Sequence, residues 1–166
     1  MTTATRHGSA VITLPSDTEI LIERKFDAPA ALVFDAYTTP AHVQRWWGFE
    51  SSEWLVCDID LRVGGAWRFV TREEGGLEVG FHGEYRTISR PTRLVATEVF
   101  EGAPDPAPGD EAINDLTLTE VDGVTTLSLR CSYPSKDVRD MVIESGMETG
   151  LQVSYDRLED LVRSSS

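Results

Sequence analysis

Apolar and polar residues alternate along most of the first 133 positions of the chain. In residues 18–26, Ile20, Ile22 and Phe26 share one parity, with Arg24 as the exception, and this pattern predicts a strand with one buried face. Similar runs between residues 53 and 133 are separated by turns rich in glycine and proline and predict six further strands. Strands joined by consecutive hairpins pair antiparallel. Asp122-Gly123, between the last two runs, is a strong signal for a type I′ turn.

Two short helices are predicted after the first strand. Asp27 suits an N-cap and Pro29 suits a first helical turn, so the first helix should run to about Tyr37. Pro40 starts a second helix that ends near Trp47.

The period changes near the C-terminus. From Ile143 to Val162, apolar residues recur every three or four positions, which predicts one amphipathic helix over about residues 136–163. Gly146 and Gly150 lie within it, one turn apart, and each costs up to about 1 kcal/mol relative to alanine. Either the helix kinks there, or another group approaches its backbone closely.

These elements predict a single α+β domain over residues 18–166, preceded by a flexible lead-in of residues 1–17. A long antiparallel sheet and one long helix bury their apolar faces best when the sheet curves around the helix. We therefore expect a curved sheet of about seven strands around the C-terminal helix.

The charge and composition narrow the partners. The net charge of −13 disfavours nucleic acid and anionic membrane surfaces. No apolar run is long enough for a membrane span, and the N-terminus lacks the apolar core of a signal peptide, so we expect a cytoplasmic protein. Cys57 and Cys131 should be free, buried thiols. The three histidines have no His or Cys neighbour at ligand spacing, so neither a metal nor a cofactor is expected.

Four stretches resemble the helix-grip superfamily, also called START-like or SRPBCC. They are "RKFDAPAALVFDAYTTPAHVQRWWG", "CDIDLRVGGAWRF", "FHGEYRTISRPTRLVATEVFEG" and "YPSKDVRDMVIESGMETGLQVSYDRLEDL". Within the superfamily, the chain is similar to proteins related to the C-terminal domain of the activator of the heat-shock protein 90 ATPase. The resemblance implies a cavity between sheet and helix. Relatives bind lipids, polyketides or hormones there, some catalyse cyclisation, and the activator itself binds a chaperone.

Aromatic residues are the main candidates for the wall of such a cavity. The four tryptophans either fill the core or place one or two rings at the cavity. Alternation puts Trp67 with Phe69, and it puts Phe81 with Gly83 and Tyr85. If that parity faces inward, Gly83 leaves a gap beside aromatic walls. Trp46 or its neighbour is expected at the mouth of the cavity, with Met141 and Met147 as lining groups on the helix.

Glu98 is the candidate for acid–base chemistry, and its orientation stays open. It faces inward if Leu94, Ala96 and Phe100 do, beside Tyr133 and Cys131, and it is solvated if the alternate residues face inward. An apolar pocket would raise the pKa of its carboxyl.

Three functions are compatible with these features. The first is a protein that binds a hydrophobic or aromatic small molecule, with no catalytic motif evident. The second is a cyclase- or hydrolase-like enzyme that uses the same cavity. The third, a chaperone-binding module, is implied by the resemblance alone. It is weakened because the activator needs a separate N-terminal domain, and only residues 1–17 precede the fold here. A homodimer stays open.

Overall fold

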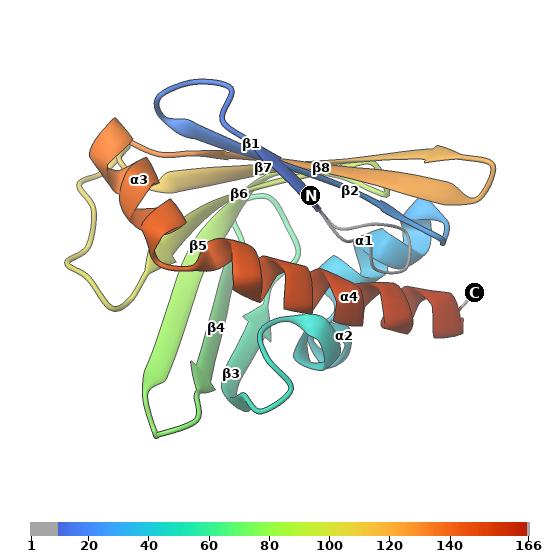
Figure 1. Cartoon of the computed structure of the whole chain (residues 1–166), viewed down its shortest axis with the longest axis horizontal. Helices are drawn as coiled ribbons and strands as arrows, with labels where there is room; N and C mark the ends of the chain where they lie inside the picture. The colour runs from blue at the N-terminus through green and yellow to red at the C-terminus, as the bar shows by residue number, and fades with distance from the viewer. Residues whose placement is uncertain (1–9, 166) are drawn as a thin grey trace.

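A computed structural model describes residues 10–165. Eight strands form one antiparallel sheet in the order β1-β2-β8-β7-β6-β5-β4-β3. Their bounds are β1 Val11–Thr13, β2 Glu19–Phe26, β3 Glu53–Ile59, β4 Ala66–Arg72, β5 Glu78–Ser89, β6 Arg93–Phe100, β7 Ala112–Val121 and β8 Val124–Ser132. The sheet curves, so that β1, β2, β8 and β7 form one wall and β5, β4 and β3 form another (Figure 1). The predicted α+β helix-grip architecture is confirmed.

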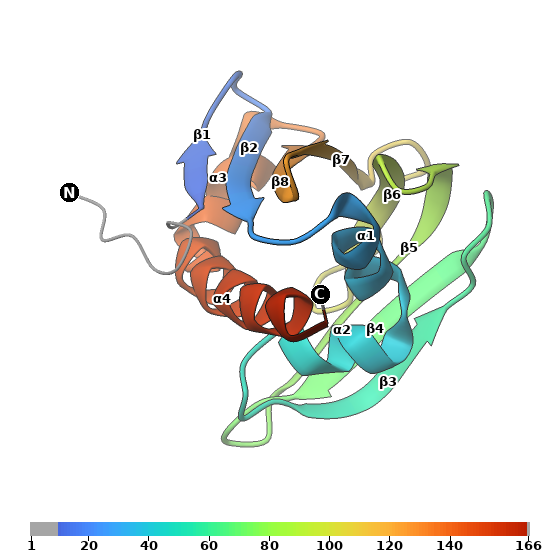
Figure 2. The same ribbon diagram turned by 90° about the vertical axis from the view of Figure 1, so that its right-hand side faces the viewer.

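Four helices complete the chain: α1 Ala30–Thr38, α2 Pro40–Trp46, α3 Lys136–Glu144 and α4 Met147–Ser165. The last of these runs along the concave side of the sheet, and α1 and α2 pack against its C-terminal part (Figures 1 and 2). The apolar stripe of α4 and the inward residues of the strands therefore form one core.

One prediction of the strand pattern differs from the structure, and another is confirmed. An eighth strand, β1, pairs with β2 through Val11 and Glu23 and lies in the segment predicted as a flexible lead-in. Residues 1–9 of that lead-in lie outside the described residues. The type I′ turn is confirmed, because Asp122 and Gly123 both have positive φ, at 53° and 79°.

The predicted single C-terminal helix is two helices. Gly146 has φ +85°, a left-handed conformation that ends α3 and lets the chain change direction before α4. The kink that the sequence left open is therefore at Gly146. Gly150 lies inside α4, where the ring of Phe49 is 3.7 Å from the position of an added Cβ.

The start of α1 also differs from the prediction. Pro29, not Asp27, occupies the N-cap position and offers no side-chain cap. Instead, Glu120 of β7 accepts a 2.8 Å hydrogen bond from the backbone nitrogen of Ala30. A carboxylate from a neighbouring strand thus satisfies a free amide at the positive end of the helix.

Arg24, the polar exception in the first predicted strand, is buried beneath α4. Its Nη2 lies 3.1 Å from an oxygen of Asp156 and 3.7 Å from one of Glu159. Glu159 is fully buried, and its second oxygen accepts a hydrogen bond from the backbone nitrogen of Asp27. The pair joins β2 to α4, which explains a charged residue at a core position.

Candidate functional site

Strand register places the predicted aromatic residues on the concave face of the sheet. Trp67 pairs with Gly83, Phe69 pairs with Phe81, and these rings belong to the core or pack against it. Tyr85 pairs with Ala96 of β6, which also packs against the core. The parity read from the sequence therefore selects one inward face across β4, β5 and β6.

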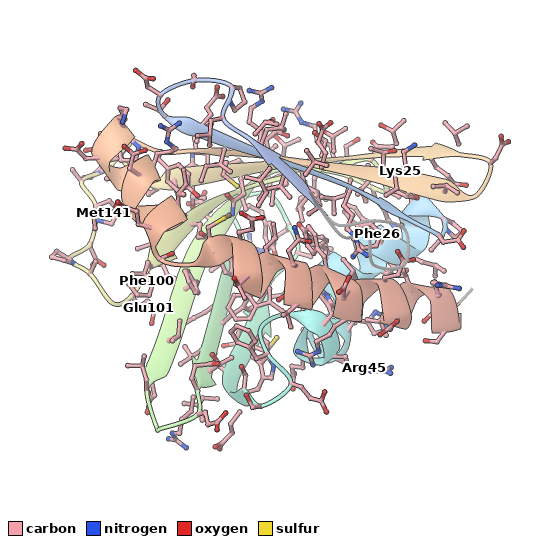
Figure 3. All side chains as sticks on the ribbon, in the orientation of Figure 1. Lys25, Phe26, Arg45, Phe100, Glu101 and Met141 are labelled. Atoms are coloured by element: carbon pink, nitrogen blue, oxygen red, sulfur yellow. The ribbon has the colours of Figure 1, made fainter. Side chains whose placement is uncertain are left out.

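The interior is not uniformly packed. One part, the packed region, is formed by side chains almost without exposed surface: Phe26, Phe34, Trp46, Tyr155 and Leu158. Another part, the half-buried region, is formed by inward side chains that keep some exposed surface: Trp47, Trp54, Phe81, Glu98, Tyr133, Met147 and Leu151. Phe26 lies at the end of the sheet near α1 (Figure 3). Phe100, two residues after Glu98 on β6, lies at the other end of the sheet, on the side of α3.

An aromatic cluster is the main feature of the half-buried region. The ring of Trp47 lies 5.5 Å from that of Trp54, 5.5 Å from that of Phe69 and 5.7 Å from that of Phe81. These rings meet at steep angles, a favourable arrangement for aromatic pairs. The residues come from the end of α2 and from three adjacent strands, so the cluster joins a helix terminus to the sheet.

Polar groups lie on the same concave face. Asn114 of β7 donates a 3.1 Å hydrogen bond from Nδ2 to Oε1 of Glu98. Asn114 pairs across the ladder with Cys131, a buried core residue, which fixes the inward direction of the Glu98 side chain. Burial raises the pKa of the Glu98 carboxyl above its ordinary value, and the hydrogen bond from Asn114 only partly opposes this.

Two neighbours of Glu98 also ionise with difficulty. Burial raises the pKa of the Cys131 thiol to about 12, and the nearby Glu98 adds to the shift. Burial likewise raises the pKa of Tyr133, with contributions from Cys131 and Glu98. At neutral pH these groups are un-ionised, so they can act as hydrogen-bonding groups but not as ready nucleophiles.

Two tyrosine hydroxyls meet in the packed region. The hydroxyl oxygens of Tyr37 and Tyr155 lie 2.5 Å apart, and Trp46 donates from Nε1 to the backbone oxygen of Ala36. Burial raises the pKa of both tyrosines. Because these polar atoms satisfy one another, this pair is a structural feature of the core.

Three sequence expectations need correction. Gly83 does not leave a gap, because a Cβ there would lie 1.9 Å from the backbone oxygen of Thr97 and 2.5 Å from Nε1 of Trp67. The indole of Trp67 occupies that space and donates a 3.2 Å hydrogen bond to the same oxygen. Met141 is 67% exposed on α3 and does not line the interior. Trp46 is 3% exposed and sits in the packed region, not at a mouth.

The sequence pattern left Trp47 as the alternative to Trp46, did not single out Trp54 among the tryptophans, and missed Asn114. Trp47 is the C-cap of α2, with extended backbone angles, so its side chain does not follow the helical period. Trp54 lies next to an irregularity in the pairing of β3 with β4, which obscures its strand parity. Asn114 could have been found from the sequence, since it lies on the same face of β7 as the buried residues Leu116 and Leu118.

The surface of residues 10–165 includes two hollows that are not lined by Trp67, Phe69, Phe81 or Tyr85. One of about 350 Å³ lies between β1 and the α3–α4 junction, where Ile12, Ile143 and Met147 contribute apolar surface. The other, of about 250 Å³, lies between α2 and α4 and includes Arg45 and Arg157. Within the same residues, no group of three or more His, Cys, Asp or Glu side chains could hold a metal. None of the helices described is long and apolar enough to cross a membrane.

A curved antiparallel sheet, a C-terminal helix across its concave face and a partly accessible interior between them define a helix-grip protein of the START-like class. The chain belongs to the family of Activator of Hsp90 ATPase homolog 1-like proteins, whose model matches residues 27–163. The resemblance seen in the sequence is thereby confirmed. No curated protein sequence matches the chain.

Solved structures support the fold over almost the whole chain. A Rhodobacter sphaeroides protein is 26% identical, with a TM-score of 0.85, covering 94% of this chain and 99% of that one. Protein Ms6760 from Mycobacterium smegmatis is 23% identical, with a TM-score of 0.81, covering 93% and 96% of the two chains. DynU16, from the dynemicin biosynthetic locus, is 22% identical, with a TM-score of 0.67, covering 92% of this chain and 49% of that one.

Proposed function

We propose that this protein binds a hydrophobic or aromatic small molecule in the half-buried region of its interior. The observation that carries the proposal is the cluster around Trp47, whose rings meet at steep angles yet keep some exposed surface. Apolar surface gains roughly 25 cal/mol per Å² when it leaves water, so a ligand that covered these rings would be stabilised there. The free cysteines fit a cytoplasmic setting, which we also propose.

The proposal is tested with Nile red, a neutral fluorophore that brightens in apolar sites. The wild type should bind it, and Trp47→Ala should weaken binding by about fivefold or more, because losing part of an aromatic contact costs about 1 kcal/mol or more. Leu77→Ala, at an exposed position in the β4–β5 turn, is the matched control and should bind like the wild type. No binding by the wild type would refute the proposal, as would equal binding by Trp47→Ala.

A cyclase- or hydrolase-like enzyme is a second candidate, and Glu98 is the observation that favours it. A carboxyl on the inner face with a raised pKa is suited to donate a proton near neutral pH. The hydrolase branch is tested by comparing p-nitrophenyl acetate hydrolysis by the wild type and by Glu98→Leu. Equal rates in the two proteins would count against a catalytic Glu98 for that reaction.

A chaperone-binding role follows only from the description of the family. The test is direct: the ATPase rate of purified Hsp90 is measured with and without this chain. We expect no change, because the proposed site is an interior one. A stimulated rate would favour the chaperone role over the small-molecule proposal.

A further inference from the structure

Glu159 and Glu98 both lie on the inner side of the sheet, and their surroundings differ. Glu159 faces Arg24 at 3.7 Å and accepts a backbone hydrogen bond, so its negative charge is compensated. Glu98 receives one hydrogen bond, from the neutral amide of Asn114. Among residues 10–165, none of the ion pairs found involves Glu98, and no cation lowers its pKa.

The groups around Glu98 leave one of its oxygens available. Asn114 occupies Oε1, and Cys131 and Tyr133 nearby are un-ionised. A carboxyl whose pKa is raised by burial, with no cation beside it, is neutral over a wider range of pH and in that form offers one O–H donor. The residue keeps some exposed surface, so that donor is within reach of a bound molecule.

The aromatic cluster lies beside this carboxyl. Glu98 is on β6 between Ala96, which pairs with Tyr85, and Phe100, which pairs with Phe81. The Phe81 ring is 5.3 Å from that of Phe100 and 5.7 Å from that of Trp47. A flat ring held against Phe81 would therefore bring its edge toward Glu98.

We infer that Glu98, positioned by Asn114, recognises a neutral hydrogen-bond acceptor, such as a ketone carbonyl, on a ring-shaped ligand. This inference rests on the proposed function and specifies its ligand class. An anionic ligand is disfavoured because the described groups around Glu98 supply no positive charge. A cationic ligand would require an ionised Glu98 and is an outcome that the test separates.

The test uses 9-fluorenone and fluorene, two tricyclic probes of nearly the same shape that differ by one carbonyl. The wild type should bind fluorenone about tenfold more tightly, as one added hydrogen bond predicts. Glu98→Leu should lose this preference and still bind fluorene. Glu98→Gln should keep it, because the amide of glutamine also donates. Glu84→Gln, exposed on β5, is the matched control and should behave like the wild type. Thermal melting of each variant verifies that it is folded.

The outcomes separate the inference from the function on which it rests. If the wild type binds both probes equally, the Glu98 inference is overturned and the small-molecule site stands. If neither probe binds although Nile red does, only the inference is overturned; if Nile red does not bind either, both are overturned. Equal weakening of both probes by Glu98→Leu would mean a structural role for Glu98 and would also overturn the inference. Tighter binding of the 9-aminofluorene cation than of fluorenone would mean that Glu98 is ionised. It would overturn the inference in favour of a ligand that carries a protonated amine.

Discussion

Gly83→Ala is a sensitive probe of how closely the interior is packed around Trp67. A methyl group there would lie 1.9 Å from the backbone oxygen of Thr97 and 2.5 Å from Nε1 of Trp67. Neither neighbour can move without cost, since the oxygen belongs to β6 and the indole is hydrogen-bonded to it at 3.2 Å. Glycine is therefore required at this position by close approach and not by an unusual backbone angle.

The expected loss of stability is the sum of opposing effects. Overpacking of a filled site costs about 1–3 kcal/mol, and loosening the hydrogen bond from Trp67 adds about 1 kcal/mol. The lower entropy of alanine in the unfolded chain offsets at most about 1 kcal/mol. The net loss should be about 1–3 kcal/mol, which for a chain of this length lowers the melting temperature by roughly 3–9 °C.

The measurement is urea unfolding followed by circular dichroism, with Gly150→Ala as the matched control. Gly150 is inside α4, where an added Cβ meets only the Phe49 ring at 3.7 Å, so alanine should stabilise by up to about 1 kcal/mol. The two substitutions add the same atom and should shift the midpoint in opposite directions. If Gly83→Ala unfolded at the wild-type urea concentration or above, the space beside Trp67 would be open and the packing argument would be wrong.

Three further predictions concern charge and thiol chemistry. Arg24→Met should destabilise the fold by about 3–5 kcal/mol in urea unfolding, because it leaves the fully buried Glu159 without its cation. Adding Glu159→Gln should recover part of this loss. If the effects of the two substitutions were additive, the pairing would be contradicted. Because burial raises the pKa of Glu98, the folded protein binds more protons than the unfolded one between the two pKa values, so stability falls as pH rises through that window. The advantage of Glu98→Gln over the wild type should accordingly grow as the pH rises above the ordinary pKa of a glutamate, and a constant difference would show that the pKa is not raised. Burial raises the pKa of the Cys57 thiol to about 11 and that of the Cys131 thiol to about 12. Ellman's reagent at about pH 8 should therefore modify both thiols quickly only after the protein is unfolded. Fast reaction of the native protein would refute this.

The sequence predicted those parts of the fold that depend on long periodic patterns. The alternation in the strands, the Asp122-Gly123 turn and the apolar stripe of the C-terminal helix each repeat a local signal over many residues. β1 has three residues, too few for alternation to be recognised. The break at Gly146 was ambiguous, because glycine is tolerated in a helix at modest cost and only the left-handed φ shows that the helix ends.

The candidate site was predictable only to the level of which face a residue occupies. Parity put Trp67 and Gly83 on the inner face, but whether glycine faces empty space depends on the direction of the Trp67 ring, which parity does not fix. Trp46 and Trp47 show the same limit at a helix end. The last helical residue points into the core, and the next one leaves the helical period and joins the aromatic cluster. The prediction that Met141 lines the interior was wrong for a related reason. The helix breaks at Gly146, so the apolar stripe of α4 does not continue onto α3.

In this protein, the residues that stabilise the fold differ from those proposed to recognise a ligand. In the packed region, the ion pair of Arg24 with Glu159 joins α4 to β2, and the hydrogen bond between Tyr37 and Tyr155 joins α4 to α1. In the half-buried region, Glu98 has a single neutral partner and the rings around Trp47 keep exposed surface. Buried groups that are already paired with one another have little to offer a ligand, whereas an accessible donor beside exposed aromatic faces offers both an apolar and a polar contact. A ligand site in this fold is therefore expected where the core is least complete, and substitutions there should change binding more than they change folding.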